Sequence, residues 1–191
     1  MNTSFLFLAE GFEEVEALSV VDIMRRANLP VTTVSTSNSL QVTGAHNITV
    51  TADAMFADVD FSGAEWLILP GGMPGASNLA AHDDLCNLLK AQNAKKGKIA
   101  AICASPAVVL APLGILDGKH AICYPGFEKS MALSKIGTKP VESDGNIITA
   151  NGPATATMFA LAIVAHSLGE NTARDIAEGL LLYNRPQEFY F

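Results

Sequence analysis

The chain has 191 residues, with 12 Lys or Arg against 19 Asp or Glu, so its formal net charge is −7. Hydrophobic residues make up 49% of it, which excludes intrinsic disorder, and the acidic balance argues against nucleic-acid binding, which needs clustered basic residues. Three cysteines are too few for a disulfide scaffold, and their odd number fits a reducing, cytoplasmic compartment. The length predicts one compact domain over residues 1–191.

No membrane or export segment is expected. The apolar opening at residues 5–8 has no basic residue before it and meets acidic residues directly after it, so it predicts a strand. The longest charge-free stretch, residues 99–116, is interrupted by Pro106 and Pro112. We therefore expect a buried strand and a helix there, and no bilayer-spanning segment.

In the first half of the chain, short apolar runs alternate with amphipathic ones. Residues 4–9 predict a strand, and residues 14–28 predict a helix with one apolar face. Val31–Ser35 predicts the next strand, and residues 42–59 hold short β-like pieces. Trp66–Leu69 predicts a strand that ends abruptly at a Pro-Gly-Gly sequence.

The second half continues the alternation and closes with two helices. Asp144-Gly145 predicts a hairpin with a type I′ turn over residues 141–149. The remaining expected elements are helices at 83–95, from Pro106, at 127–133, from Pro153 to before Gly169 and from Thr172, and strands at 99–102 and 120–123.

Strands that are apolar on both faces and separated by helices predict an α/β fold, in which a doubly wound, mainly parallel sheet carries helices on both faces. Ligands of such folds bind outside the carboxyl ends of the strands. Candidate functional residues are therefore sought just after each strand.

Acidic residues follow the first strand. Glu13, Glu14 and Glu16 crowd the predicted start of the first helix, where negative charge is favourable. That effect accounts for Glu13 and Glu14. Glu16 lies between apolar residues of a helix packed on the sheet, so its carboxyl is expected to be partly desolvated and to favour the protonated form.

A glycine pair and a cysteine follow two further strands. Gly71-Gly72 predicts either a plain tight turn or exposed N–H groups that hold an anion or oxyanion. Cys103 stands between a buried strand and a helix, which is the layout of a nucleophile elbow. The alternative is a small buried core residue. The helix N-terminus predicts a lowered pKa for the Cys103 thiol.

The remaining cysteines and histidines carry weaker signals. Cys86 is expected in a helix core, and Cys123 at a strand end, where it could approach the same cleft. The histidines are scattered and no cysteine pair has metal-ligand spacing, so no metal site is predicted. His46, in the β-like region, is a candidate for a cleft or interface.

Four motifs in order resemble the ThiJ/PfpI family, the superfamily of the Parkinson-associated protein deglycase. They are GFEEVEA at 11–17, LPGG at 69–72, AAICASP at 100–106 and Gly152-Pro153 before FAL at 159–161. The resemblance runs nearly end to end, and Leu182-Tyr183-Asn184 is similar to the bacterial YajL branch.

The resemblance implies a single ThiJ/PfpI domain with a flavodoxin-like fold of the class I glutamine amidotransferase type, which forms a homodimer and needs no cofactor. It implies that Cys103 is the reactive cysteine, that Glu16 hydrogen-bonds its sulfur, and that the N–H groups of Gly72 and Ala104 form an oxyanion or sulfinate pocket.

Three positions depart from the family pattern. Ala104 stands where protease-like members carry His, Tyr124 where the deglycase branch has another His, and Asn151 where a basic residue often precedes the late Gly-Pro. No Cys-His pair is therefore evident, which weakens a peptidase interpretation.

We expect a cysteine-dependent enzyme of the glyoxalase or deglycase type with an oxidation-sensitive cysteine. It would act on small carbonyl compounds or glycated adducts, without nucleic acid or membrane partners. One alternative is a redox sensor or stress chaperone without turnover, in which Cys103 oxidises to sulfinic acid. The other is an intracellular cysteine peptidase.

Overall fold

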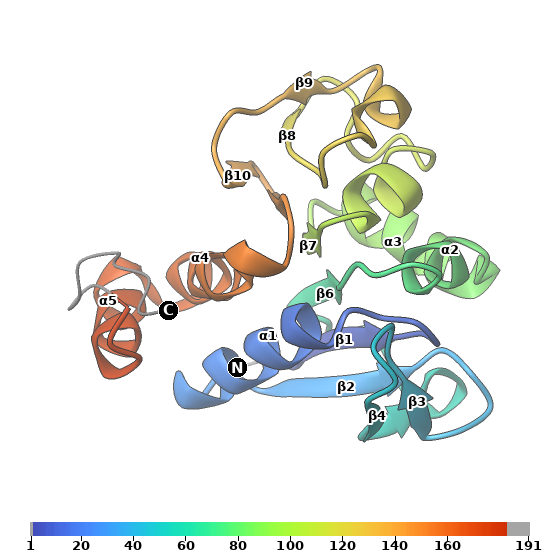
Figure 1. Ribbon diagram of the computed structural model, residues 1–191, viewed down its shortest axis with the longest axis horizontal. Coiled ribbons are helices and arrows are strands. Elements are labelled where there is room, and N and C mark those ends of the chain that lie inside the picture. Colours follow the sequence, from blue (N-terminus) through green and yellow to red (C-terminus); the bar gives the residue numbers. More distant parts are fainter. Residues whose placement is uncertain (1, 183–191) are drawn as a thin grey trace.

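A seven-stranded sheet forms the centre of the computed structural model, which describes residues 2–182 (Figure 1). Its strands are β1 (Ser4–Leu8), β2 (Val31–Ser35), β5 (Ala54–Met55), β6 (Trp66–Leu69), β7 (Lys98–Ile102), β10 (Val141–Asp144) and β11 (Ile147–Ala150). They lie in the order β10-β11-β7-β6-β1-β2-β5, and only β10 pairs antiparallel to its neighbour. The predicted doubly wound, mainly parallel sheet is confirmed.

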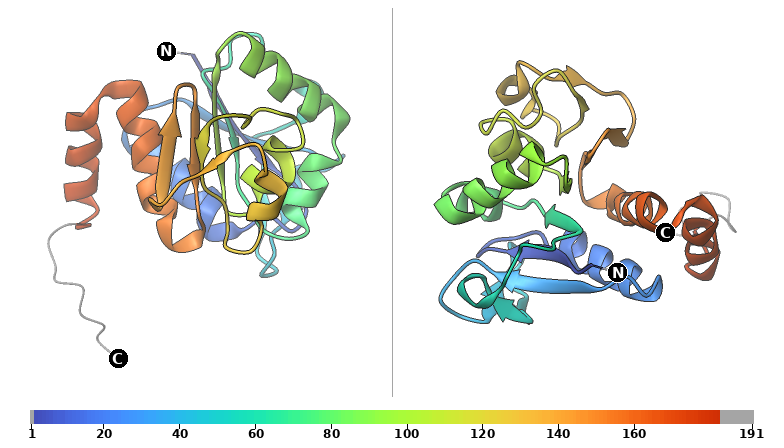
Figure 2. Two further views of the ribbon diagram at one scale, coloured as in Figure 1. Left: turned by 90° about the horizontal axis from the view of Figure 1, so that it is seen from above. Right: turned by 180° about the vertical axis from the view of Figure 1, so that it is seen from behind.

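Helices cover both faces of the sheet, as Figure 2 shows. On one face lie α1 (Glu14–Arg26) and α4 (Ala156–Leu168), with α5 (Glu170–Gly179) packed on α4. On the other lie α2 (Gly75–Ala80), α3 (Asp83–Ala94) and the short π-helical segment η2 (Pro106–Leu110).

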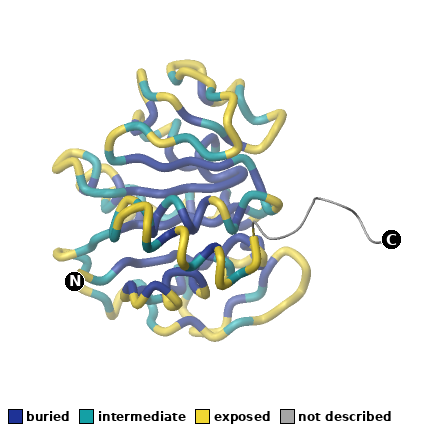
Figure 3. Tube along the Cα trace, turned by 90° about the vertical axis from the view of Figure 1, so that its left-hand side faces the viewer, coloured by how far each residue is buried: buried dark blue, intermediate teal, exposed yellow. Residues whose placement is uncertain are grey.

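Alternation along the strands divides the core between the two layers. Leu6 and Leu8 of β1 pack in the cluster formed with α1 and α4, whereas Phe5 and Phe7 pack in the cluster formed with α2 and α3. Both faces of the central strands are therefore buried, which is visible as the dark band in Figure 3 and explains why the chain carries so few charges.

Several element boundaries differ from the sequence prediction. The strand expected at 120–123 is only β8 (His120–Ala121), and it pairs with β9 (Lys135–Ile136) outside the main sheet. Helix α2 was not predicted, because the glycines and prolines before it favour a turn. The 42–59 region forms the hairpin of β3 (Gln41–Thr43) and β4 (Thr49–Thr51), then β5 and the short turn η1 (Phe56–Asp58).

The boundaries of the last helices and the turn of the predicted hairpin also differ from the prediction. A turn η4 (Pro153–Thr155) precedes α4, η3 (Glu128–Met131) is the small helix expected near 127–133, and α5 begins at Glu170 before the predicted Thr172. In the β10–β11 hairpin, the pairing of Asp144 with Ile147 leaves Gly145 and Asn146 as the central residues. Of these two, Gly145 alone has positive φ, so the turn is not the predicted type I′.

Two further sequence-based expectations concern the C-terminal residues and the membrane. Tyr183 and Asn184, which carry the similarity to the YajL branch, lie outside the described residues. Within residues 2–182, no helix combines the length and apolar character needed to cross a bilayer.

Candidate active site

Cys103 lies in a sharp turn between β7 and η2. Its φ is 64°, a left-handed conformation that is unfavourable for a residue with a side chain. Its N–H donates to Ala150 O at 2.9 Å, which extends the pairing of β7 with β11 into the turn. The buried Ser105 hydroxyl donates to Pro70 O at 2.6 Å, which joins the far side of the turn to the loop after β6. Together these bonds hold the backbone geometry of a nucleophile elbow.

Two backbone N–H groups lie beside the Cys103 sulfur. They belong to Gly72 and Ala104, and both lower the pKa of the thiol by hydrogen bonding. Gly72 has φ 89°, and a side chain there would meet Gly11 O and Glu13 N at 2.5 Å each, so the loop can approach the site this closely only with glycine. The structure thus brings together the predicted Cys103, Gly72 and Ala104.

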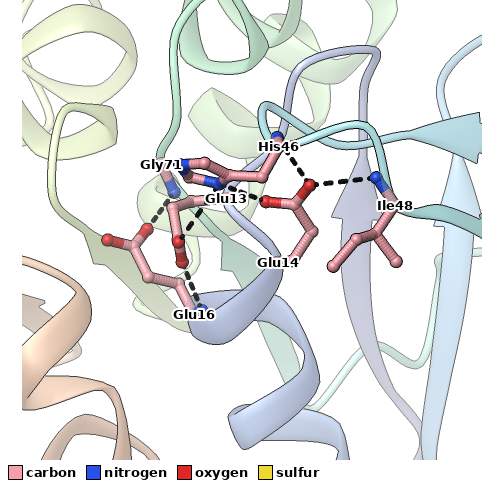
Figure 4. Close-up of polar contacts among 6 residues, drawn as sticks. All are labelled: Glu13, Glu14, Glu16, His46, Ile48 and Gly71. Atoms are coloured by element: carbon pink, nitrogen blue, oxygen red, sulfur yellow. Dashed lines mark hydrogen bonds and ion pairs between the residues drawn. The ribbon is translucent and has the colours of Figure 1, made fainter.

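Glu16 lies on the other side of this loop, on the first turn of α1 (Figure 4). Its side chain is fully buried, and its Oε2 accepts from Gly71 N at 2.7 Å. Among residues 2–182, its Oε1 has no hydrogen-bond partner. A Cβ on Gly71 would lie 2.6 Å from Cys103 Cβ and 2.9 Å from Glu16 Oε2, so Gly71 fills the space between the two side chains.

Burial dominates the protonation of this Cys103–Glu16 pair. Desolvation raises the pKa of Glu16 to about 7, although the hydrogen bond from Gly71 N–H and the nearby Cys103 thiol favour its carboxylate. Desolvation, together with the nearby Glu16 carboxylate, raises the pKa of Cys103 to about 12. Near neutral pH the pair therefore holds a thiol beside a carboxyl group that is close to half ionised.

The lowered thiol pKa expected from the helix N-terminus is therefore wrong. The segment η2 has only five residues, so its dipole is small, whereas the cost of burying the thiolate beside a carboxylate is large. For Glu16 the prediction agrees with the structure, since desolvation raises its pKa.

Glu13 and Glu14 accept hydrogen bonds from backbone N–H groups, and Glu14 also contacts the ring of His46. Glu13 caps α1, because its Oε2 accepts from Glu16 N at 2.8 Å. Glu14 Oε1 accepts from His46 N at 2.7 Å and from Ile48 N at 3.4 Å, and its Oε2 lies 2.8 Å from His46 Nδ1 (Figure 4). Burial by itself raises the pKa of Glu14, but these hydrogen bonds outweigh it and lower the pKa.

Glu13, Glu14 and His46 also form the one group of possible metal ligands found in the described part of the chain, with their ligand atoms all within 4.8 Å of one another. The Glu14 oxygens are, however, already satisfied by three donors of the β3–β4 hairpin. We therefore interpret this group as a fastening of the hairpin to α1, and we assign no metal to it.

The positions that depart from the family pattern lie near the site. Tyr124 N donates to Cys103 O at 2.7 Å, and its half-exposed ring lies against Gly152. Asn151 accepts from the Thr155 hydroxyl at 3.1 Å, at the start of η4. Among residues 2–182, no hydrogen bond joins Cys103 to a histidine, so the Cys-His pair of a peptidase is not formed within them.

The other two cysteines, and the histidines at the start of α3 and in α4, have contacts of their own away from Glu16. All three cysteines are free, and Cys123 packs in the α2–α3 core cluster while Cys103 packs in the α1–α4 cluster. His82 Nδ1 accepts from Leu85 N at the start of α3, and His166 bonds Ser143 at the end of α4. Cys86 Sγ donates to Ala80 O.

Sequence reasoning named Gly71 and His46 without their partners, and it missed Ser105. Gly71 supplies the N–H that binds Glu16, Ser105 anchors the turn, and His46 binds Glu14. The glycine pair did signal close backbone approach. The residues around Ser105 and His46 do not indicate their partners, Pro70 and Glu14, which lie 35 and 32 residues away in the sequence.

Comparisons with known proteins find similar chains in several organisms. The chain is 34% and 33% identical to DJ-1 homologs B and A of Arabidopsis thaliana, and it spans 40% and 49% of their lengths. It is 33% identical over 177 residues to the "Glutathione-independent glyoxalase DJR-1.2" of Caenorhabditis elegans, with 91% of this chain and 92% of the relative covered. A solved structure named "Toxoplasma gondii DJ-1, oxidized" superposes with a TM-score of 0.90 at 34% identity, covering 95% of this chain and 98% of that one.

A family model also covers most of the chain. The model described as the DJ-1/PfpI family matches residues 3–166, which include the Cys103 turn, Glu16 and the loop after β6. The chain therefore belongs to the DJ-1/PfpI family.

Proposed function

We propose that this protein is a cofactor-free enzyme of the glyoxalase or deglycase type, which acts on reactive carbonyls such as methylglyoxal or on early glycated adducts. The observation that carries the proposal is the Cys103–Glu16 pair, a thiol and a carboxyl group that meet beside two backbone N–H groups. The name of the Caenorhabditis elegans relative as a glutathione-independent glyoxalase supports the same reaction class.

The first step adds the sulfur to the aldehyde. The Glu16 carboxylate takes the thiol proton while Sγ bonds to the aldehyde carbon, and the carbonyl π electrons move to oxygen. The N–H groups of Gly72 and Ala104 beside the sulfur would stabilise that oxyanion until Glu16 returns the proton to it, which restores the Glu16 carboxylate. The product is a hemithioacetal on Cys103.

The second step is an internal oxidation and reduction that needs no cofactor. Glu16 removes the proton from the former aldehyde carbon, which gives an enediolate, and returns it to the neighbouring carbonyl carbon. The hydroxyl proton of the first carbon passes to the oxygen of the second, which leaves a thioester of lactate on Cys103. Water hydrolyses the thioester to lactate and restores the thiol. One methylglyoxal and one water thus give one lactic acid.

The pKa of Glu16 suits this role. A group that must both accept and return a proton works best when its pKa lies near the operating pH. Burial raises that of Glu16 to about 7. The raised pKa of Cys103 then poses no obstacle, because the proton is transferred to Glu16 during the attack.

The test is lactate formation from methylglyoxal by the wild type, Cys103→Ser and Glu16→Gln. We expect both variants to lose at least about 100-fold in kcat/KM, since each lacks a group that acts in the transition state. Cys86→Ser is the matched control and should retain the wild-type rate. Equal rates from all four proteins would refute the proposed mechanism.

A redox-sensing role is the second candidate. Its support is that the same two N–H groups and the Glu16 carboxyl could hydrogen-bond a Cys103 sulfinate, and that the Toxoplasma gondii relative carries the word "oxidized" in its name. Intact mass and peptide mapping after mild peroxide treatment test it. Two oxygens gained on Cys103 alone support the role, whereas oxidation spread over Cys86 and Cys123 contradicts it.

No observation favours the peptidase alternative over these two. The homodimer, the cytoplasmic location and the stress-chaperone role rest on the family resemblance and composition, and they stay predictions.

A further inference from the structure

The β3–β4 hairpin is fastened to the start of α1 beside the candidate active site. Glu14 accepts hydrogen bonds from His46 N and Ile48 N and lies 2.8 Å from His46 Nδ1. Ala45 N donates to Phe12 O at 2.8 Å, so the backbone of the same turn also joins the loop before α1. We call the contacts of His46 and Ile48 with Glu14 the His46 latch (Figure 4).

The His46 latch is linked by charge to Glu16. His46 Nδ1 lies 3.9 Å from Glu13 Oε1, and the other oxygen of Glu13 accepts from the backbone N–H of Glu16. The negative charge of Glu13 is one of the causes that raise the pKa of Glu16. His46, Glu13 and Glu16 therefore form an unbroken electrostatic series that ends at Cys103.

The charges around this series are unbalanced without His46. Glu13 and Glu14 of α1 both face the imidazole, and Glu10 of the preceding loop binds Thr43 N, next to the hairpin turn. Glu16 faces Glu13 and Cys103. Within residues 2–182, the ion pairs of Glu13 and Glu14 are made with His46, while Arg25 and Arg26 pair with Asp53 and Asp22.

We propose that His46 is a positioning residue for the Cys103–Glu16 pair: its imidazolium balances the carboxylates of Glu13 and Glu14 and thereby sets the pH at which Glu16 loses its proton. The inference deepens the proposed function, since Glu16 is the proton carrier there. Its experiment does not depend on turnover.

The sign of the effect follows from Coulomb's law. A positive His46 offsets the field of Glu13 at Glu16, which makes the Glu16 carboxylate easier to form. The hydrogen bond to Glu14 raises the pKa of His46, so the imidazolium persists further toward neutral pH. Loss of that positive charge leaves Glu13 and Glu14 uncompensated, and Glu16 then holds its proton to a higher pH.

The experiment measures the rate of Cys103 alkylation by iodoacetamide between pH 5 and 9, with peptide mapping, in the wild type, His46→Gln and His46→Lys. Iodoacetamide is uncharged, so the profile reports the protonation of the pair. We expect the midpoint to rise by about half a pH unit in His46→Gln, which corresponds to one partly screened charge at this range. His46→Lys should return the midpoint to within about 0.2 pH units of the wild type.

Two outcomes overturn the inference. An unchanged midpoint in His46→Gln would show that His46 does not act on the pair. A midpoint in His46→Lys equal to that of His46→Gln would show that the effect comes from the shape of the latch and not from charge. His120→Gln, which replaces an exposed histidine on β8, is the matched control and should leave the profile unchanged. If no lactate forms but the midpoint still shifts, the proposed reaction fails and this inference stands.

Discussion

Two buried cysteines follow strands of this protein, and they differ in their neighbours more than in their protonation. Burial raises the pKa of Cys103 to about 12 and that of Cys123 to about 11, so both are thiols at neutral pH. Cys103 has a carboxyl group and two N–H groups beside its sulfur, whereas the Cys123 thiol is affected by burial and by the charge of Glu128. Under the proposed mechanism, the reactivity of Cys103 would depend on a local proton acceptor, and a low thiol pKa would not be required.

The largest expected effect is a direct contrast between the two thiols. In the folded wild type at pH 8, iodoacetamide should label Cys103 about 100-fold or more faster than Cys123, because a positioned general base contributes about 10²–10⁴ in rate. Among residues 2–182, no carboxylate hydrogen-bonds the Cys123 thiol. Peptide mapping over time measures both rates in one sample. Equal labelling would mean that global opening, and not the local site, controls access.

The next effect concerns the free energy of unfolding. Burial gives Glu16 a higher pKa in the folded protein, near 7, than in the unfolded chain, near 4.5. The folded protein therefore loses stability as the pH increases from 4.5 through 7, because Glu16 must ionise while buried. Between pH 5 and 8, the wild type should therefore lose up to about 3 kcal/mol more than Glu16→Gln.

Urea unfolding at both pH values measures this difference. His46 and Glu14 titrate in both proteins, so most of their contribution cancels, and only the smaller coupling of His46 to Glu16 remains in the difference. Parallel pH dependence in the two proteins would show that Glu16 is not desolvated as the structure has it.

A smaller effect on stability and labelling is expected from a substitution of Gly71, which lies between Cys103 and Glu16. Gly71→Ala places a methyl group against Cys103 and Glu16, which should destabilise the fold by about 1–3 kcal/mol and slow Cys103 labelling. Gly63→Ala, where a Cβ meets nothing within 4 Å, is the control and should change neither quantity. Wild-type labelling in Gly71→Ala would contradict the close approach.

Local sequence signals predicted the sheet, the Cys103 turn and the glycine loop, because each depends on a pattern of a few consecutive residues. The direction of the Cys103 pKa could not be predicted in this way. It depends on burial and on Glu16, a residue from a distant helix, whereas the sequence argument considered only the adjacent helix N-terminus.

Long-range pairings were also out of reach. Glu14 faces His46 across 32 residues, and the single clue was a histidine in a region of weak β-like pattern. Helix α2 was missed for a different reason. The glycines and prolines at residues 70–74 indicate a turn, and it is the packing of Leu79 in the core that supports the helix.

The central claim is that the Glu16 carboxylate accepts the proton of the Cys103 thiol, and the pH profile of Cys103 alkylation in the wild type and Glu16→Gln tests it most directly. The account predicts a rise in the wild-type rate with a midpoint near pH 7, where Glu16 ionises, and no such step in Glu16→Gln, whose rate should climb only at more alkaline pH. The same profile in both proteins would contradict it.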